Sequence, residues 1–196
     1  EVTRELIEVM KDFSTQVCPH LHVCLQSGSD KILRGMKRRW TRRHIIDRCQ
    51  LVKNELHLPA FTTDVIVGFP GETEDDFADT VDACRQIGFS KIHMFPFSPR
   101  KGTPAAGMEE QIPKKIKSER GAKIADLQKE LKREYFQSLV GEELQLLVEK
   151  VNDDGTVTGT SCRYATVNAI APNAAENELI TVKIETAGDL LSGQAI

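Results

Sequence analysis

The sequence lacks the features that would place it in several large classes of protein. Its longest apolar stretch, TTDVIVGF at residues 62–69, is far shorter than the roughly 20 residues that a membrane-spanning helix needs. The net charge is −3 and the pI about 6.0, so the chain as a whole is not drawn electrostatically to nucleic acid. With 40% hydrophobic and 28% charged residues among 196, the composition excludes disorder, collagen and a coiled coil and predicts a folded protein with a sizeable core.

The cysteines also lack a recognisable framework. Five are present, at positions 18, 24, 49, 84 and 162, and no two have C-x-x-C spacing. An odd number without paired spacing indicates free thiols in a reducing compartment, and we predict buried thiols rather than ligands and a cytoplasmic location. The first residue is Glu, and we expect the chain to be a fragment of a longer protein.

Residues 1–140 alternate between helical and strand patterns. Helices are predicted at 3–14, after Ser29, at 42–57, 74–87 and 113–139, and strands at 21–26, 62–69 and 91–97. Such alternation is typical of parallel strands joined by crossover helices. Because parallel sheets usually have more than three strands, we expect part of a larger α/β barrel or sheet.

After Gly141 the periodicity changes to alternating apolar and polar residues. The segments 143–151, 155–160, 164–170 and 179–186, with LSGQAI at the end, predict a five-stranded β-barrel. We place the boundary near residue 140. The module from 140 onward has three Lys/Arg against nine Asp/Glu, so it is acidic whereas the rest of the chain is slightly basic.

Polar and aromatic residues follow each predicted parallel strand. The three strand ends read Gln26-Ser27-Gly28-Ser29, Gly68-Phe69-Pro70-Gly71-Glu72-Thr73 and Phe95-Pro96-Phe97-Ser98. Ligands of parallel α/β folds bind at this end of the strands, so the pattern suits a polar small molecule with a planar ring. The alternative is that these residues only form turns and helix caps.

Charged groups near the strands have structural and functional interpretations. Asp64, inside an apolar strand, requires either a salt bridge to a helix Arg or Lys or a direct role with a ligand. His20, His22 and His93 have no acidic or cysteine companion at metal-ligand spacing, so we predict ordinary structural histidines and assign no metal ligand and no catalytic residue.

Two basic segments are candidates for RNA contacts. The first interleaves Trp40 with Lys37, Arg38, Arg39, Arg42 and Arg43, and the second is Arg100-Lys101. In the acidic module, Arg163 and Tyr164 could add a local contact. The alternative is a solvated charged face.

Three motifs together resemble the radical S-adenosylmethionine tRNA methylthiotransferase family. They are HLHVCLQSGSDKIL followed by MKR, then TTDVIVGFPGETEDDF, then KIHMFPFSPRKGTPAA. The last motif most resembles the branch that acts on N6-threonylcarbamoyladenosine beside the tRNA anticodon, and the segment after Gly141 is similar to the family's RNA-binding TRAM domain.

The resemblance implies an architecture and cofactors. Residues 1–140 would be the C-terminal half of a partial (β/α)6, TIM-like radical barrel, and residues 141–196 a small all-β TRAM barrel. The family uses S-adenosylmethionine and two [4Fe–4S] clusters, whose cysteine motifs are absent here, so the chain alone is expected to be inactive. Cys24 stands where relatives often have Pro or another non-ligand.

The resemblance also assigns binding residues and partners. Asp64, Ile66, Gly68 and Glu72 match the family's fifth-strand motif, Gln26 and Ser27 would face the ribose and methionine, and Phe95 and Phe97 would line the adenine. The expected partner is the tRNA anticodon stem-loop, contacted by Arg38, Arg39, Arg42, Arg43, Arg100, Lys101 and Arg163. No membrane partner is expected, and the exposed edge at 21–26 predicts self-association.

The sequence is also compatible with other functions. The substrate could instead be isopentenyladenosine in tRNA or an aspartate of a ribosomal protein. The chain could be a non-catalytic RNA-binding module, or a plain α/β domain whose turns only look like motifs.

Overall fold

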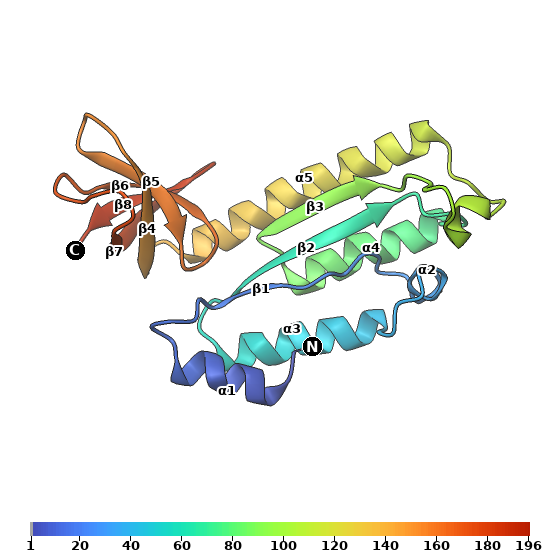
Figure 1. The fold of residues 1–196 in the computed structure, drawn as a ribbon, viewed down its shortest axis with the longest axis horizontal. Coiled ribbons are helices and arrows are strands. Elements are labelled where there is room, and N and C mark those ends of the chain that lie inside the picture. The colour runs from blue at the N-terminus through green and yellow to red at the C-terminus, as the bar shows by residue number, and fades with distance from the viewer. Residues whose placement is uncertain (1) are drawn as a thin grey trace. The chain divides into compact units, whose positions relative to one another are not determined.

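The computed structural model describes residues 2–196, which form two compact units. One comprises His22–Val52 and Phe61–Leu131, and the other comprises the residues up to Leu21, Lys53–Ala60 and Lys132–Ile196. The elements are labelled in Figure 1, and α5 (Lys114–Ser138) runs from one unit into the other.

A three-stranded sheet with the order β1-β2-β3 forms the centre of the α/β part. Its strands are β1 (His20–His22), β2 (Ala60–Val67) and β3 (Lys91–Pro96), and β2 pairs with β3 in parallel from Thr62↔Lys91 to Val67↔Pro96. The chain passes from β1 to β2 through α2 (Asp30–Gly35) and α3 (Arg42–Glu55), and from β2 to β3 through α4 (Glu74–Ile87). The predicted parallel α/β architecture is confirmed.

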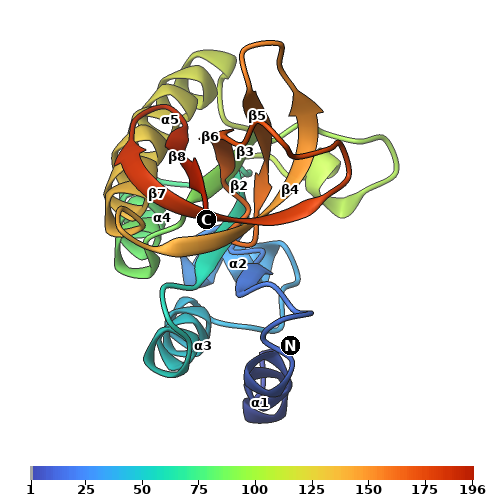
Figure 2. The same ribbon diagram turned by 90° about the vertical axis from the view of Figure 1, so that its left-hand side faces the viewer.

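The two faces of this sheet differ in burial. On β2, Thr63, Val65 and Val67 are fully buried, and α4 and α5 lie on one side of the sheet (Figure 2). The alternate residues Asp64 and Ile66 stay partly exposed. Since alternate side chains of a strand point to opposite faces, one face forms the core and the other is open.

Local signals in the sequence set the helix starts. Ser29 caps α2 and Thr73 caps α4, where Thr73 and Asp76 form a capping box. The Thr41 hydroxyl accepts a hydrogen bond from the His44 N–H (3.2 Å) before α3. Helix α1 (Arg4–Asp12) is capped by Thr3.

The strand predicted at 21–26 is shorter than expected. Regular pairing ends at His22, and only a single bridge joins Gln26 to Val65 farther along. The reason is local: Gln26 has a φ of 64° and the Leu25 N–H bonds to the Thr63 hydroxyl (3.0 Å) instead of a strand carbonyl.

The carboxyl-terminal part of the chain is a closed five-stranded barrel, with strand order β4-β5-β6-β8-β7. Its strands are β4 (Glu143–Val151), β5 (Thr156–Ser161), β6 (Thr166–Ile170), β7 (Leu179–Ala187) and β8 (Leu191–Ala195). Alternate residues such as Leu144, Leu146 and Val148 fill its core together with Phe136 and Leu139. The predicted barrel is confirmed, and its strand number is consistent with a TRAM domain.

A short 3₁₀ helix, η1 (Pro104–Gly107), lies in the loop between β3 and α5. Within residues 2–196, no helix combines the length and the apolar character that a membrane span requires.

Candidate functional site

The open face of the sheet carries a row of mixed polar and aromatic side chains. Strand register places Asp64 beside His93 and Ile66 beside Phe95, so all four point to the same face. Asp64, Ile66 and His93 are half-buried, and Phe95 is 51% exposed. This face can therefore offer a carboxylate, an imidazole and an aromatic ring to a ligand.

Gln26 and Ser27 turn the chain at the end of the first strand segment. The positive φ of Gln26 bends the backbone, and its side-chain Oε1 accepts a hydrogen bond from Arg38 (3.0 Å). The Ser27 hydroxyl is fully buried, 3.3 Å from the Thr80 hydroxyl, and it accepts from the Ser29 N–H (3.2 Å). Both side chains are engaged within the protein, so they shape this turn.

Gly28 lets this turn lie directly against α4. Its N–H donates to the Thr80 hydroxyl (2.9 Å), and a Cβ added at Gly28 would lie only 2.3 Å from the Asp79 carbonyl oxygen. Only glycine allows two backbone segments to approach so closely.

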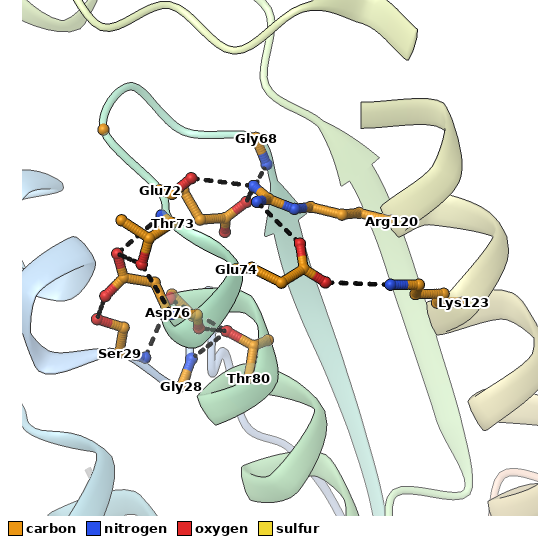
Figure 3. Close-up of polar contacts among 12 residues, drawn as sticks. Gly28, Ser29, Gly68, Glu72, Thr73, Glu74, Asp76, Thr80, Arg120 and Lys123 are labelled. Carbon is orange, nitrogen blue, oxygen red and sulfur yellow. Dashed lines mark hydrogen bonds and ion pairs between the residues drawn. The ribbon is translucent and has the colours of Figure 1, made fainter. Parts of the chain in front are cut away.

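Gly68 and Glu72 form the turn after β2, and Arg120 of α5 completes it (Figure 3). Gly68 has a φ of 73° and its N–H donates to the Glu72 carboxylate (2.6 Å), which also pairs with Arg120 (2.6 Å). The two side chains are almost wholly buried, 1% exposed for Glu72 and 6% for Arg120. Burial raises the pKa of Glu72, although the Gly68 N–H and the Arg120 guanidinium oppose that effect.

Asp76 connects the starts of α2 and α4, as Figure 3 shows. Its carboxylate accepts hydrogen bonds from Ser29 (2.6 Å), from the Thr73 N–H (2.9 Å) and from Lys31 (3.1 Å). Burial by itself would raise the pKa of Asp76, but these bonds outweigh it and lower the pKa to about 2. The carboxylate is therefore ionised at neutral pH and fixes the geometry of two strand-end turns.

Phe97 lies directly after the last residue of β3. It contacts Phe69 edge-on, with ring centroids 5.2 Å apart, and the Lys117 ammonium lies 5.3 Å from its ring centroid. Of the two predicted adenine-lining rings, Phe95 is the exposed one and Phe97 is half-buried against its neighbours.

The environment of Asp64 differs from what the sequence suggested. Its salt-bridge partner is His22 of the neighbouring strand (3.7 Å) and not a helix Arg or Lys. His22, Cys24 and Asp64 each place a ligand atom within 4.8 Å of the others. The prediction that the histidines have no acidic or cysteine companion is therefore wrong for His22, because the alignment of adjacent strands brings Asp64 next to it from 42 positions away.

The five cysteines also differ in exposure. Cys49 and Cys84 are buried as predicted, and burial raises the pKa of Cys84 to about 12. Cys18 is exposed, while Cys24 and Cys162 are intermediate. The prediction of buried thiols is therefore wrong for Cys18 and holds only in part for Cys24 and Cys162.

The predicted RNA-contacting residues occupy varied environments. Arg39, Arg100 and Lys101 are exposed. Arg42 pairs with Asp79 and Asp82 of α4, and Arg43 pairs with Asp47 one turn along its own helix. Arg38 stacks on Trp40 at 5.3 Å.

Arg163 lies in the other compact unit. It donates hydrogen bonds to the carbonyl oxygens of Leu58 (2.9 Å) and His57 (3.1 Å). Next to it, the exposed Tyr164 ring stacks on His20 with centroids 4.5 Å apart.

Sequence reasoning missed three residues that hold this region together: Thr80, Arg120 and Lys117. All three are helix residues at positions without a motif. The only signal was their place on the helix faces that meet the strand-end turns.

Comparison with known proteins agrees with the geometry of the strand ends. Residues 1–84 match the Radical SAM superfamily. The chain is 37% identical over 188 residues to a tRNA-2-methylthio-N(6)-dimethylallyladenosine synthase of Acetivibrio thermocellus, covering 95% of this chain and 39% of that protein. The chain is homologous to radical SAM methylthiotransferases.

Other relatives carry different substrate names. The threonylcarbamoyladenosine tRNA methylthiotransferase MtaB of Bacillus subtilis (strain 168) is 36% identical over 192 residues, with 96% of this chain and 42% of that protein covered. A tRNA-2-methylthio-N(6)-dimethylallyladenosine synthase of Rhodococcus jostii (strain RHA1) is 45% identical over 148 residues, with 76% and 29% covered. The chain thus spans less than half the length of these methylthiotransferases.

Proposed function

We propose that the chain is part of an enzyme that adds a methylthio group to a modified adenosine of tRNA. The observation that carries this proposal is the open face of the sheet, with Asp64, Ile66 and Phe95 beside the Gln26 and Gly68 turns. This arrangement lies at the carboxyl ends of parallel strands, where such folds bind ligands. The names of the relatives supply the reaction.

The open face fits S-adenosylmethionine. Ile66 and Phe95 would hold the adenine ring, and the Asp64 carboxylate would interact with the polar parts of the molecule. Gln26, Ser27, Gly68 and Glu72 would support the pocket, since their groups already bond within the protein. The Oε1 atom of Glu72 is buried without a hydrogen-bond partner, which leaves one acceptor at this turn for a ligand. When bound, the cofactor would supply the radical chemistry.

The described residues do not fit a [4Fe–4S] cluster. Such a cluster is held by thiolates, generally four. Among residues 2–196, the one group of three potential metal ligands contains a single thiol, that of Cys24. We propose that both clusters of the whole enzyme are held by residues outside this chain, and that residues 1–140 complete the radical barrel while 141–196 form the TRAM domain.

The proposed partner is the anticodon stem-loop of tRNA. The exposed side chains Arg39, Arg100 and Lys101 are proposed to contact phosphates, because solvent can reach them. Arg38, Arg42, Arg43 and Arg163 would contribute charge while they maintain their internal bonds.

For the nucleoside we propose N6-threonylcarbamoyladenosine, on the basis of the segment HMFPFSPRKGTPAA, which covers the end of β3 and the loop after it. The second candidate is dimethylallyladenosine, because relatives with that name align over most of the chain.

Mass spectrometry of nucleosides from total tRNA tests the proposal. Cells lacking the full gene should lose the methylthio form of threonylcarbamoyladenosine and accumulate its precursor. A gene carrying Phe95→Ala should fail to restore the modification, whereas Phe13→Ala, at an exposed ring of the other compact unit, should restore it. Loss of the dimethylallyl form instead would move the substrate to the second candidate, and unchanged nucleosides would overturn the tRNA proposal.

A further inference from the structure

The open face of the sheet carries a second cluster whose chemistry differs from cofactor binding. His22 and Cys24 are two residues apart on an extended segment, so their side chains point to the same side. Asp64, on the adjacent strand, faces them. One imidazole nitrogen, one thiol sulfur and one carboxylate oxygen therefore lie within 4.8 Å of one another.

We propose that His22, Cys24 and Asp64 form a binding site for a single zinc-type divalent ion. Thiolate and imidazole ligands favour Zn²⁺ over Mg²⁺ or Ca²⁺, which prefer oxygen. Three protein ligands with a fourth position left to solvent is a common zinc arrangement. This site goes beyond the proposed methylthio transfer, although it shares Asp64 with the proposed S-adenosylmethionine site.

The distance between the imidazole and the carboxylate is close to the one that an ion requires. Nitrogen and oxygen ligands about 2.0–2.1 Å from a tetrahedral ion lie about 3.3 Å apart. The His22 Nε2 and Asp64 Oδ1 atoms are 3.7 Å apart, so a shift of a few tenths of an ångström would close this pair around an ion. Partial exposure of all three side chains gives an ion access from solvent.

The surroundings of His22 are those of an oriented metal ligand. Its Nδ1 lies 3.0 Å from the Thr62 hydroxyl, whereas its other ring nitrogen, Nε2, is the one near Asp64. A hydrogen bond at that nitrogen fixes the ring and leaves Nε2 for the ion, which is how outer partners position histidine ligands. Thr62 is thus a positioning residue.

The charges of the ion and its ligands balance. When a divalent ion binds, the Cys24 thiol releases its proton to solvent as the metal–sulfur bond forms, and the ion offsets one thiolate and one carboxylate.

Titration of the reduced 196-residue chain with Co²⁺ tests the site. The expected result is one Co²⁺ per chain, with a thiolate-to-cobalt charge-transfer band, release of about one proton from the thiol, and displacement of Co²⁺ by Zn²⁺. Loss of a hydrogen-bond partner that orients a ligand costs about 10- to 100-fold in metal affinity, so Thr62→Val should weaken binding by that factor. Cys24→Ser should abolish the band, and Asp64→Asn should weaken binding by more than about 100-fold.

Matched variants separate this site from other thiols. Cys18→Ser removes an exposed cysteine of the other compact unit and should leave the affinity and the band unchanged. A band that survives in Cys24→Ser, that disappears in Cys18→Ser, or that titrates at other than one ion per chain would overturn the proposal. Because the readout needs neither S-adenosylmethionine nor tRNA, its failure is distinct from failure of the proposed function.

Discussion

At the scale of single residues, the Glu72–Arg120 ion pair should be the most sensitive to substitution, because both charged side chains are buried. We predict that Arg120→Met destabilises the protein by about 3–5 kcal/mol at pH 7, since it leaves the Glu72 carboxylate buried without its cation. The pKa of Glu72 is already raised, and losing the arginine raises it further. A raised carboxyl pKa means that stability is greatest below the unfolded value of 4.5 and falls as pH rises through the folded value. Urea unfolding at pH 5 and pH 7 should therefore show the variant recovering part of its loss at pH 5.

The control for this variant is Lys123→Met, which removes an exposed ion pair with Glu74. The Lys123→Met substitution should lower the free energy of unfolding by less than about 1 kcal/mol, and by the same amount at pH 5 and pH 7. Equal losses for the two variants, or an Arg120→Met loss that does not change with pH, would contradict the account of a buried pair.

A second prediction for a single residue concerns the stability of a Gly28 variant. An added methyl group would meet the Asp79 carbonyl oxygen at 2.3 Å and the Thr80 Cα at 2.5 Å, which are backbone atoms that cannot rotate away. Gly28→Ala should therefore destabilise the protein by about 1–3 kcal/mol, as overpacking does, measured by thermal or urea unfolding. Gly107→Ala, where a Cβ meets nothing within 4 Å, should change stability little.

Residue partners were the part of the site that the sequence predicted least well. Asp64 stood out as a carboxylate in an apolar strand, but its partner His22 depends on how β1 and β2 align, which no local pattern encodes. Arg120 is 48 positions from Glu72 and has no motif of its own. Sequence reasoning identifies groups that need a partner more readily than it identifies the partner.

At the scale of elements, the start of α4 depends on Asp76. The carboxylate has a pKa of about 2 in the folded protein against 3.8 unfolded, so its contribution is present above pH 3.8 and is lost as pH falls toward 2. The shift corresponds to about 2 kcal/mol. The Asp76→Asn variant should be less stable than the natural protein by about that amount at pH 7. In urea unfolding, the difference in the free energy of unfolding between the two proteins should become smaller as the pH falls from 5 to 2.5.

Asp75→Asn provides the comparison on the same helical turn. Asp75 is exposed, so its replacement should cost only the few tenths of a kcal/mol of a helix-terminal charge. A gap for Asp76→Asn that stays constant with pH would show that the hydrogen bonds from Ser29, Thr73 and Lys31 do not set the ionisation of this carboxyl.

Elements with strong local signals were predicted well, and the exceptions have physical causes. The capping residues Thr73 and Ser29 and the alternating pattern of β4 are local, so the helix starts and the barrel strands followed from them. The segment 21–26 also alternates, but the turn at Gln26 and the Thr63 side chain end the ladder at His22. Whether a run of strand-forming residues is paired depends on its neighbour and not on its own composition.

At the scale of the whole molecule, β1 is an edge strand: the sheet order places β2 on one side of it. The Val23 N–H donates to Thr62 (2.8 Å), so the N–H of Cys24, the next residue, points to the free edge. Free strand edges pair with other chains unless something blocks them. We therefore predict that the chain self-associates through this edge, which light scattering would detect as a mass above 21.9 kDa that falls on dilution.

Two substitutions at Cys24 separate edge pairing from thiol chemistry. Cys24→Pro removes the outward N–H, and should give a monomer under reducing conditions. Cys24→Ser removes the thiol but keeps the N–H, and should associate like the natural chain. Because Cys24→Ser also eliminates the proposed metal ligand, equal association of that variant and the natural chain would show that pairing requires the backbone and not an ion. If the natural chain is a monomer at all concentrations, the edge of β1 is not an association surface. The polar side chains on the open face of the sheet would then contact ligands and not a second chain.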